Sequence, residues 1–206
     1  GPSSPNGRAR AAGDGRARSP RCCLMVAVLL LAAARAHALS FTDVTAAAGI
    51  TSTHRYASEG AWGEPGVVAG GVAAGDYDRD GYVDLFLIRG QLGAAKLFRN
   101  RGNGTFEDAT AGSGIAVGPG LHSSATFADV DGDGWLDLLV VGFESTWPSL
   151  WHNEGNGTFV DATAGSGLTL PGEHAFSASF GDYVRDGVLD LFVSLLYVAL
   201  LGTVGG

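Results

Sequence analysis

Short apolar runs alternate along this chain with segments rich in Gly, Asn and Asp. In one unit, a run of small residues, GVAAGDY at 71–77, leads into an acidic segment, and the apolar run VDLFLI at 83–88 leaves it. A third run, KLFRN at 96–100, is followed by the turn-forming residues RGNG and a fourth run, TFEDAT. Apolar runs of this length between turn residues indicate β-strands. The pattern therefore predicts four short strands per unit, joined by turns.

The whole pattern returns after 53 residues. The acidic segments, which share this spacing, begin at Asp76, Asp129 and Asp182. The stretch 97–115 also recurs as 150–168, and 41–50 is a further partial copy. A fixed period of this size is typical of repeat architectures, whose units bury their apolar faces against each other. Four strands per unit, with small residues on the strand nearest the axis, predict an all-β fold of β-propeller blades.

The chain divides into three predicted regions. Residues 1–38 form a low-complexity leader and a secretory signal peptide, in which an apolar run at 24–34 precedes the small-residue pattern AHA and cleavage is expected after Ala38. That run is too short to span a bilayer comfortably. Residues 39–193 hold the repeats, with acidic loops at 76–84, 129–137 and 182–190, and residues 194–206 form an apolar tail outside the repeat pattern. We therefore expect a secreted, extracellular protein.

Charge favours cations as ligands. Six of the 13 basic residues precede position 39, where one acid lies, so the remainder carries 7 basic and 20 acidic residues, a balance of −13. Nucleic acids and anionic membranes bind basic patches, so neither is an expected partner. Eleven of those 20 acids fall in the three loops. Bound divalent ions would relieve their mutual repulsion.

The loops have a pattern that suits a hard cation, which takes several oxygen ligands. Counted from the first aspartate, carboxylates stand at positions 1, 3, 5 and 9, with glycine at 6 and a backbone carbonyl at 7. The predicted Ca²⁺ ligands of the first two loops are Asp76, Asp78, Asp80, the Tyr82 carbonyl and Asp84, and Asp129, Asp131, Asp133, the Trp135 carbonyl and Asp137. Mg²⁺ fits less well, because it keeps more of its water.

The third loop departs from this pattern, since Val184 stands at position 3. Its predicted ligands are Asp182, Asp186, the Val188 carbonyl and Asp190. With one carboxylate fewer, we expect this loop to bind Ca²⁺ more weakly or not at all.

Two alternatives to a calcium loop explain the acidic segments less well. An EF-hand opens with the same residues but needs a Glu at position 12 between two helices. Position 12 holds Leu87, Val140 and Val193, inside predicted strands. Ordinary turns are also rich in Asp and Gly, but they do not explain four carboxylates crowded into one loop twice. The calcium loop is the favoured interpretation.

Other residues that could carry chemistry have simpler interpretations. His54, His122 and His174 are not in equivalent repeat positions, and we expect surface or loop histidines. Asn103 and Asn156 begin glycosylation acceptor sequences, but Asn-Gly is also a preferred hairpin turn pair, and turn chemistry is the favoured interpretation. Residues 51–66 are extra in the first unit and are predicted to form a surface insertion.

The segments GVAAGDYDRDGYVDLF, LFRNRGNGTFEDAT and AGSGI resemble the FG-GAP/VCBS repeat family, and together they are most similar to its cartilage acidic protein and UnbV/ASPIC group. The resemblance covers about 41–193 and implies a secreted β-propeller, usually seven-bladed, with Ca²⁺ in the loop of each blade. The final LLYVALLGTVGG departs from the family, because no Leu-Phe-x-Asn strand follows Asp190. We therefore interpret the chain as a fragment of about two and a half blades, fewer than closure needs.

These observations predict a calcium-binding segment without catalytic activity that serves adhesion or contacts with the extracellular matrix or cell surface. Its partner would be an extracellular protein or glycan. The alternative is an accessory domain of a secreted enzyme, such as a lyase or a phospholipase-type hydrolase, which the family resemblance also implies. The sequence contains no nucleophile elbow, Walker loop or dinucleotide fingerprint.

Overall fold

The computed structural model describes residues 40–55, 69–143, 148–168 and 174–196. The chain divides into two compact units, residues 1–43 and 44–206, and every strand below belongs to the second. The predicted signal peptide, most of the insertion and the last ten residues lie outside the described ranges. In the described part, no helix has the length and apolarity that crossing a membrane requires.

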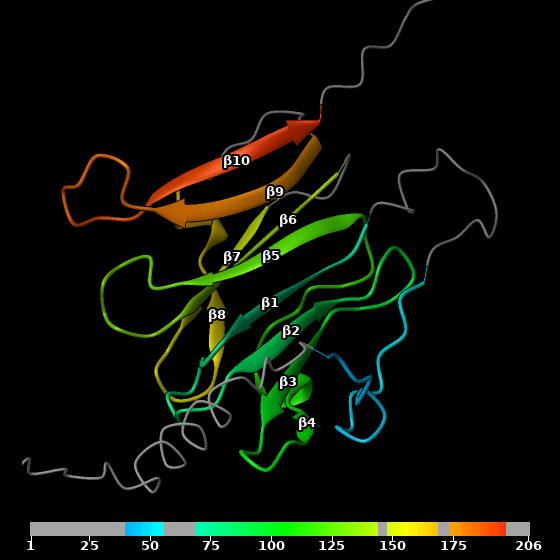
Figure 1. The fold of residues 1–206 in the computed structure, drawn as a ribbon. Coiled ribbons are helices and arrows are strands. Elements are labelled where there is room, and N and C mark those ends of the chain that lie inside the picture. Colours follow the sequence, from blue (N-terminus) through cyan, green and yellow to red (C-terminus); the bar gives the residue numbers. More distant parts are fainter. Residues whose placement is uncertain (1–39, 56–68, 144–147, 169–173, 197–206) are drawn as a thin grey trace, which may run out of the picture. The chain divides into compact units, whose positions relative to one another are not determined.

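Three antiparallel sheets follow one another along the chain (Figure 1). The first has the order β1-β2-β3-β4, with strands Gly71–Gly75, Asp84–Ile88, Lys96–Asn100 and Phe106–Asp108. The second, β5-β6-β7-β8, comprises His122–Ala128, Asp137–Gly142, Ser149–Asn153 and Phe159–Asp161. The third pairs β9, His174–Gly181, with β10, Asp190–Leu196. Short 3₁₀ helices, η2 at Thr110–Gly112 and η3 at Thr163–Gly165, follow the fourth strands.

The predicted all-β fold with four strands per unit is therefore confirmed for the first two units. Each acidic loop joins the first and second strands of its sheet at the same register, where the residue before the loop pairs with the last aspartate. The pairs are Gly75 with Asp84, Ala128 with Asp137, and Gly181 with Asp190. The 53-residue period of the sequence is thus a period of the structure.

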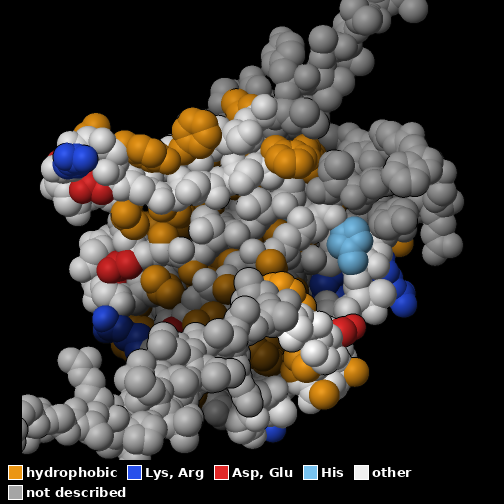
Figure 2. Space-filling view, viewed as in Figure 1, with side chains coloured by type: hydrophobic (Ala, Val, Ile, Leu, Met, Phe, Trp, Pro, Cys, Tyr) orange, Lys and Arg blue, Asp and Glu red, His pale blue; other side chains and the backbone are white. Residues whose placement is uncertain are grey.

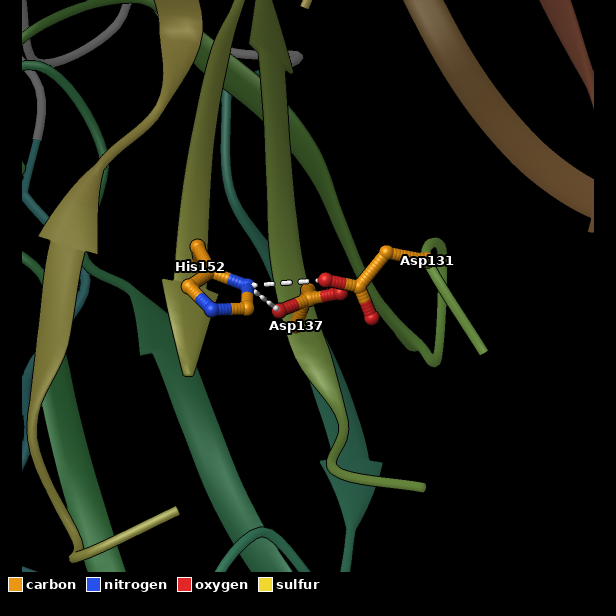
Figure 3. A group of neighbouring side chains, drawn as sticks. All are labelled: Asp131, Asp137 and His152. Carbon is orange, nitrogen blue, oxygen red and sulfur yellow. Dashed lines mark hydrogen bonds and ion pairs between the residues drawn. The ribbon is translucent and has the colours of Figure 1, made fainter. Parts of the chain in front are cut away.

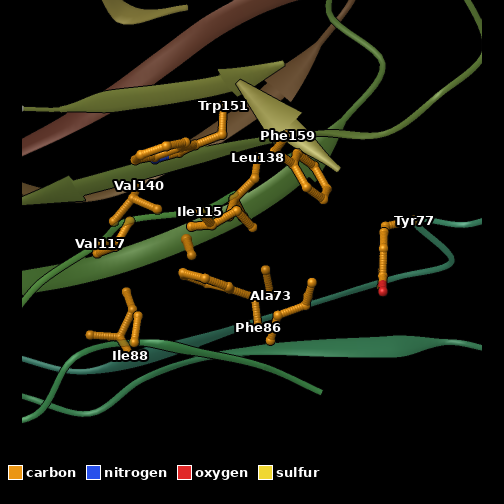
Figure 4. Close-up of a cluster of buried hydrophobic side chains, with 13 residues drawn as sticks. Ala73, Tyr77, Phe86, Ile88, Ile115, Val117, Leu138, Val140, Trp151 and Phe159 are labelled. Carbon is orange, nitrogen blue, oxygen red and sulfur yellow. The ribbon is translucent and has the colours of Figure 1, made fainter. Parts of the chain in front are cut away.

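A shared apolar core lies between the first two sheets (Figure 4). Alternate side chains of the second strands enter it, because successive residues of a strand point to opposite faces. Phe86, Leu97, Leu138 and Val140 are completely buried there. Trp151 adds to this core from β7. Burying side chains of this size contributes about 1.5–3 kcal/mol each, which makes this core the main attachment between neighbouring blades.

Small residues on the first strand allow the blades to approach closely, as the sequence predicted. A Cβ on Gly75 would lie 2.9 Å from Leu136 Cδ1 and 3.1 Å from Phe127 Cβ. A Cβ on Gly71 would lie 3.1 Å from the Ser123 carbonyl oxygen. Larger side chains at Gly71 or Gly75 would therefore push β1 away from the second blade.

The third sheet is less covered than the other two. It packs on the second blade through a cluster that includes Leu139, Val141 and Ala175. Phe192 on its other face is 61% exposed. Phe176, whose ring lies 5.8 Å from that of Phe143, is 44% exposed, and apolar side chains gather over this region (Figure 2). In the described residues the three sheets are separate and open, as expected for part of a propeller.

Candidate metal centre

Each acidic loop adopts the same backbone conformation. Glycine at position 6 has a positive φ, between 88° and 92°, in Gly81, Gly134 and Gly187. Position 4 also has a positive φ, with values of 59° to 77° in Arg79, Gly132 and Arg185. Residues with a Cβ rarely adopt this region, so the glycine at position 6 is required by the turn. Two arginines accept the same conformation at position 4, which shows how firmly the loop imposes it.

The first aspartate of each loop closes the turn by accepting hydrogen bonds from its backbone. In the first loop, Asp76 accepts from the N–H groups of Asp80 and Gly81, at 3.1 and 2.9 Å. In the second, Asp129 accepts from Gly132 and Gly134, at 2.9 and 3.0 Å. Asp182 binds the third loop in the same way, through Asp186 and Gly187. The loop backbone thus orients the carboxylates at position 1.

The last aspartate of each complete loop is buried and ties the loop to the third strand. Asp84 is 0% exposed and accepts from the N–H groups of Tyr77 at 3.1 Å and Asn100 at 2.7 Å. Asp137 is 1% exposed and accepts from Val130 at 3.1 Å and Asn153 at 2.8 Å. Burial raises the pKa of both carboxyls, that of Asp84 to about 6, although the backbone hydrogen bonds oppose the rise.

Several of the predicted ligands converge in the first two loops. One carboxylate oxygen each from Asp76, Asp78 and Asp84 lie within 4.8 Å of one another, and the same holds for Asp129, Asp131 and Asp133. Asp131 and Asp137 also form such a group with His152. Within the described residues, the third loop contributes no group of this kind. It has Val184 at position 3, and Asp190 Oδ2 accepts there from Tyr183 at 2.8 Å.

The side chains at position 7 cover the turn between the third and fourth strands. A Cβ on Gly102 would lie 2.5 Å from the Tyr82 ring, and a Cβ on Gly155 would lie 2.8 Å from the Trp135 indole. Position 7 of the third loop is Val188, which is 62% exposed. The aromatic residues of the first two loops therefore brace the acidic loop against its own blade.

Two residues that the sequence analysis did not single out also reach the loop carboxylates. Arg99 in β3 lies with Nε 2.5 Å from Asp78 Oδ2 and Nη2 3.1 Å from Asp80 Oδ2; the Nε pair is an ion pair without the alignment of a hydrogen bond. His152 in β7 lies 3.0 Å from Asp137 Oδ1 through Nδ1. The repeat could have indicated both residues, because they are 53 positions apart and occupy the same place in the third strand.

Neighbouring loops are also joined directly. Asn153, which is completely buried, donates through Nδ2 to the Tyr77 carbonyl of the first loop at 2.9 Å and to the Leu136 carbonyl at 3.1 Å. The Arg79 guanidinium carbon lies 4.9 Å from the centre of a Trp135 ring, a favourable cation–π distance. The conformation of one loop is therefore coupled to that of the next.

The asparagines of the two acceptor sequences hold the turns between the third and fourth strands. Asn103 Oδ1 accepts from the N–H of Thr105 at 3.0 Å and from its hydroxyl at 2.7 Å. Asn156 makes the same contacts with Thr158, at 2.9 and 2.6 Å. The turn is longer than the expected two-residue hairpin, since the Arg101 N–H donates to the Thr105 carbonyl. These contacts agree with the favoured interpretation, turn chemistry, and glycosylation of these exposed asparagines is an untested alternative.

The expectation of surface or loop histidines is wrong for His122. This residue begins β5 and is partly buried, and burial lowers its pKa. His174 begins β9, and Nε2 of His54 contacts the Ala69 carbonyl. The sequence did not predict that His122 lies in a strand, because β5 begins two residues before its apolar alternation becomes clear.

The raised pKa of Asp84 predicts greater stability of the calcium-free chain in mild acid. The folded chain holds this proton up to about pH 6, whereas the ordinary pKa is 3.8. The folded state therefore binds more protons between these values, and the contribution of Asp84 to stability is lost as pH rises through 6. Urea unfolding with a chelator, from pH 4 to 7, should show this dependence in the wild type and less of it in Asp84→Asn. Parallel curves for the two proteins would contradict the assignment.

Four-stranded antiparallel sheets that repeat with the sequence, each with an aspartate loop between its first two strands, define the class of β-propeller repeat proteins. FG-GAP-like repeats match residues 76–140 and 129–193. These matches cover more than half of the chain, which therefore belongs to the FG-GAP-like repeat family.

The chain is also similar to curated relatives over a shorter stretch. Cartilage acidic protein 1 from Mus musculus is 38% identical over 82 residues, and the proteins of the same name from Homo sapiens and Xenopus tropicalis are 37% and 32% identical. Each alignment covers 40% of this chain and 11% of the relative. The chain thus spans about a tenth of the length of these relatives, and the family resemblance drawn from the sequence is confirmed.

Proposed function

We propose that this chain is a secreted, calcium-binding repeat segment without catalytic activity that serves contacts in the extracellular matrix or at the cell surface. Cleavage after Ala38 would release it from its signal peptide. The similarity to cartilage acidic protein 1 supports a matrix role, and membership of the FG-GAP-like repeat family supports a repeat scaffold. The observation that carries the calcium proposal is the convergence of carboxylates in the first two loops.

The donor set of these loops fits Ca²⁺. Two oxygens bound to one Ca²⁺ at about 2.4 Å can be at most about 4.8 Å apart. The carboxylate oxygens of Asp76, Asp78 and Asp84 are within 4.8 Å of each other, as are those of Asp129, Asp131 and Asp133. Further oxygens are available from position 5 of the first loop, position 9 of the second, and the carbonyls at position 7. Four carboxylates and one carbonyl supply five ligands, and a bidentate carboxylate or water would bring the number to the six to eight that Ca²⁺ takes.

The ion would act mainly as a structural element. Each complete loop crowds four carboxylates together, and a divalent cation converts their repulsion into attraction. Because Asp84 and Asp137 also accept hydrogen bonds from the third strand, an ion bound to them would fix the loop to the rest of the blade. Asn153 would extend this effect to the neighbouring blade.

The face that carries the loops is where we place the partner. A cleft of about 490 Å³ lies between the first two blades, beside the first loop. Its lining includes Tyr77, Asp78, Arg99, Glu107 and Asn156. This mixture of an aromatic ring, both charges and an amide suits a polar segment of a protein or a glycan.

Calorimetric titration of the full chain with Ca²⁺ should detect two strong sites, and thermal unfolding should shift upward when Ca²⁺ replaces a chelator. A ligand at one hundred times its dissociation constant stabilises the folded state by about 2.7 kcal/mol. Asp131→Ala removes a ligand of the second loop, so one of the two sites should be lost. The matched control is Glu154→Ala, which removes an exposed acid outside the loops.

A folded chain that takes up no Ca²⁺ would contradict the proposal. Equal loss of binding in Asp131→Ala and Glu154→Ala would show that total charge, rather than the loop, holds the ion.

A further inference from the structure

The two complete loops differ at one position of the third strand. Arg99 and His152 occupy equivalent places, and each side chain reaches the carboxylates of its own loop. The guanidinium of Arg99 brings a permanent positive charge and has no acceptor atom. The imidazole of His152, when neutral, offers a nitrogen lone pair that can bind a metal. The two loops thus share their aspartates but present different chemistry to an ion.

His152 and two aspartates of the second loop point toward one another (Figure 3). Nδ1 of His152 lies 3.0 Å from Asp137 Oδ1, at hydrogen-bond distance, and 3.5 Å from Asp131 Oδ2. A metal ion bound to Nδ1 would take the place of the proton in this contact. The ligand atoms of all three residues lie within 4.8 Å of one another. Asp137 is buried at the base of the group, whereas the Asp131 side chain is 48% exposed. An ion can therefore reach the group from solvent on the side of Asp131.

The spacing fits a small divalent ion with a nitrogen ligand. Ligand atoms bound tetrahedrally to Zn²⁺ at about 2.0–2.1 Å are about 3.3 Å apart. The two distances from His152 Nδ1, 3.0 and 3.5 Å, lie on either side of this value. Ca²⁺ takes oxygen ligands at longer distances and gains little from an imidazole. Imidazole together with carboxylates instead suits Zn²⁺ and its neighbours in the first transition series.

We propose that the second loop binds a transition-metal ion of the Zn²⁺ class through Asp131, Asp137 and His152 Nδ1, and that the first loop does not. The proposal rests on the proposed function in one respect, that the second loop holds a divalent cation. The same loop thereby accepts two classes of ion, Ca²⁺ through oxygens alone and Zn²⁺ with the added nitrogen.

Arg99 excludes Zn²⁺ from the corresponding place in the first loop. Its guanidinium is paired with Asp78 and Asp80, so the charge that would attract the ion is already partly compensated. It also offers no lone pair to replace the imidazole. A Zn²⁺ ion in the first loop would have carboxylates alone as side-chain ligands, a donor set that favours Ca²⁺ or Mg²⁺.

The test measures Zn²⁺ and Ca²⁺ binding by calorimetry on the full chain, with Cys22→Ser and Cys23→Ser to remove competing thiols. Wild-type loops should bind one Zn²⁺ tightly, and nitrogen-15 NMR should show the Nδ1 resonance of His152 shifting as Zn²⁺ is added. His152→Asn should weaken Zn²⁺ binding at least about tenfold. Its Ca²⁺ affinity should change less than about threefold, since the oxygen ligands are intact.

A gain-of-function variant provides the matched control. Arg99→His places an imidazole at the equivalent position of the first loop and removes the guanidinium, so it should create a second Zn²⁺ site. This variant leaves the second loop untouched and keeps the test decisive even if His152→Asn folds poorly.

Equal Zn²⁺ affinity in the wild type and His152→Asn, together with an unchanged His152 resonance, would overturn the inference. If Ca²⁺ binds and Zn²⁺ binding does not depend on His152, only this inference fails. If the folded chain binds Zn²⁺ through His152 but no Ca²⁺, the inference stands and the proposed calcium function fails.

Discussion

Asp137→Ala should lower the free energy of unfolding of the calcium-free chain by about 2–4 kcal/mol. Asp137 is 1% exposed, and its carboxylate accepts the N–H groups of Val130 and Asn153. Alanine would leave both donors buried without a partner, and each such loss costs about 1–3 kcal/mol. Removing the buried charge returns part of this energy, as the raised pKa of Asp137 indicates. Urea unfolding with a chelator measures the difference.

Two further variants separate burial from charge. Asp137→Asn keeps one acceptor oxygen but places its NH2 group against the second backbone N–H. Its loss of unfolding free energy should therefore be intermediate. Asp133→Ala removes an exposed loop carboxylate that accepts from the Trp135 N–H at 2.8 Å, and should cost less than about 1 kcal/mol. Equal effects of Asp137→Ala and Asp133→Ala would refute the structural role of Asp137.

Asn153→Ala should destabilise the chain by about 2–4 kcal/mol, also without Ca²⁺. The side chain is completely buried. It donates to the Tyr77 and Leu136 carbonyls and accepts the Gly155 N–H at 3.0 Å. Alanine would remove all three contacts, of which the one to the Tyr77 carbonyl is buried and the other two are partly buried. Thermal and urea unfolding should both detect the loss.

Asn100→Ala is the matched control for this prediction. Asn100 occupies the same place in the first blade, where it donates to the Val83 carbonyl at 2.9 Å and accepts the Gly102 N–H at 3.0 Å. It is only partly buried, so its loss should cost about 1–2 kcal/mol. The additional loss of unfolding free energy in Asn153→Ala, relative to Asn100→Ala, measures the contribution of the contact with Tyr77 between the blades. Equal losses in the two variants would show that this contact contributes nothing.

The strands could be predicted because two independent signals agree in this sequence. Apolar runs such as 84–88 and 137–142 are bounded by Gly, Asn and Asp, and the 53-residue repeat shows each boundary more than once. The third β-strand of each complete blade, ending at Asn100 and Asn153, was predicted with its observed bounds. Repetition thus compensated for the weakness of propensity in short strands.

The parts that could not be predicted depend on contacts between segments distant in sequence. The spacing of aspartates indicates a cation loop, but whether Arg99 or His152 reaches that loop depends on pairing between the second and third strands. The bond from Asn153 to Tyr77 joins residues 76 positions apart, and no local pattern encodes it. The bulge that displaces Ser123 from the pairing of β5 with β6 coincides with a contact to the next blade, where the Ser123 hydroxyl donates to the Ala175 carbonyl at 2.7 Å.

The hydrogen bond from Asn153 to the Tyr77 carbonyl makes the first loop depend on the second blade. The first acidic loop receives this donor from the blade that follows it in the chain. During synthesis on the ribosome, the first loop would therefore emerge well before Asn153. The Tyr77 carbonyl would gain this hydrogen bond only after the second blade has been made. The equivalent position for the second loop is 206, where the sequence has Gly rather than Asn. This order of completion therefore applies to the first loop, whose donor comes from the second blade.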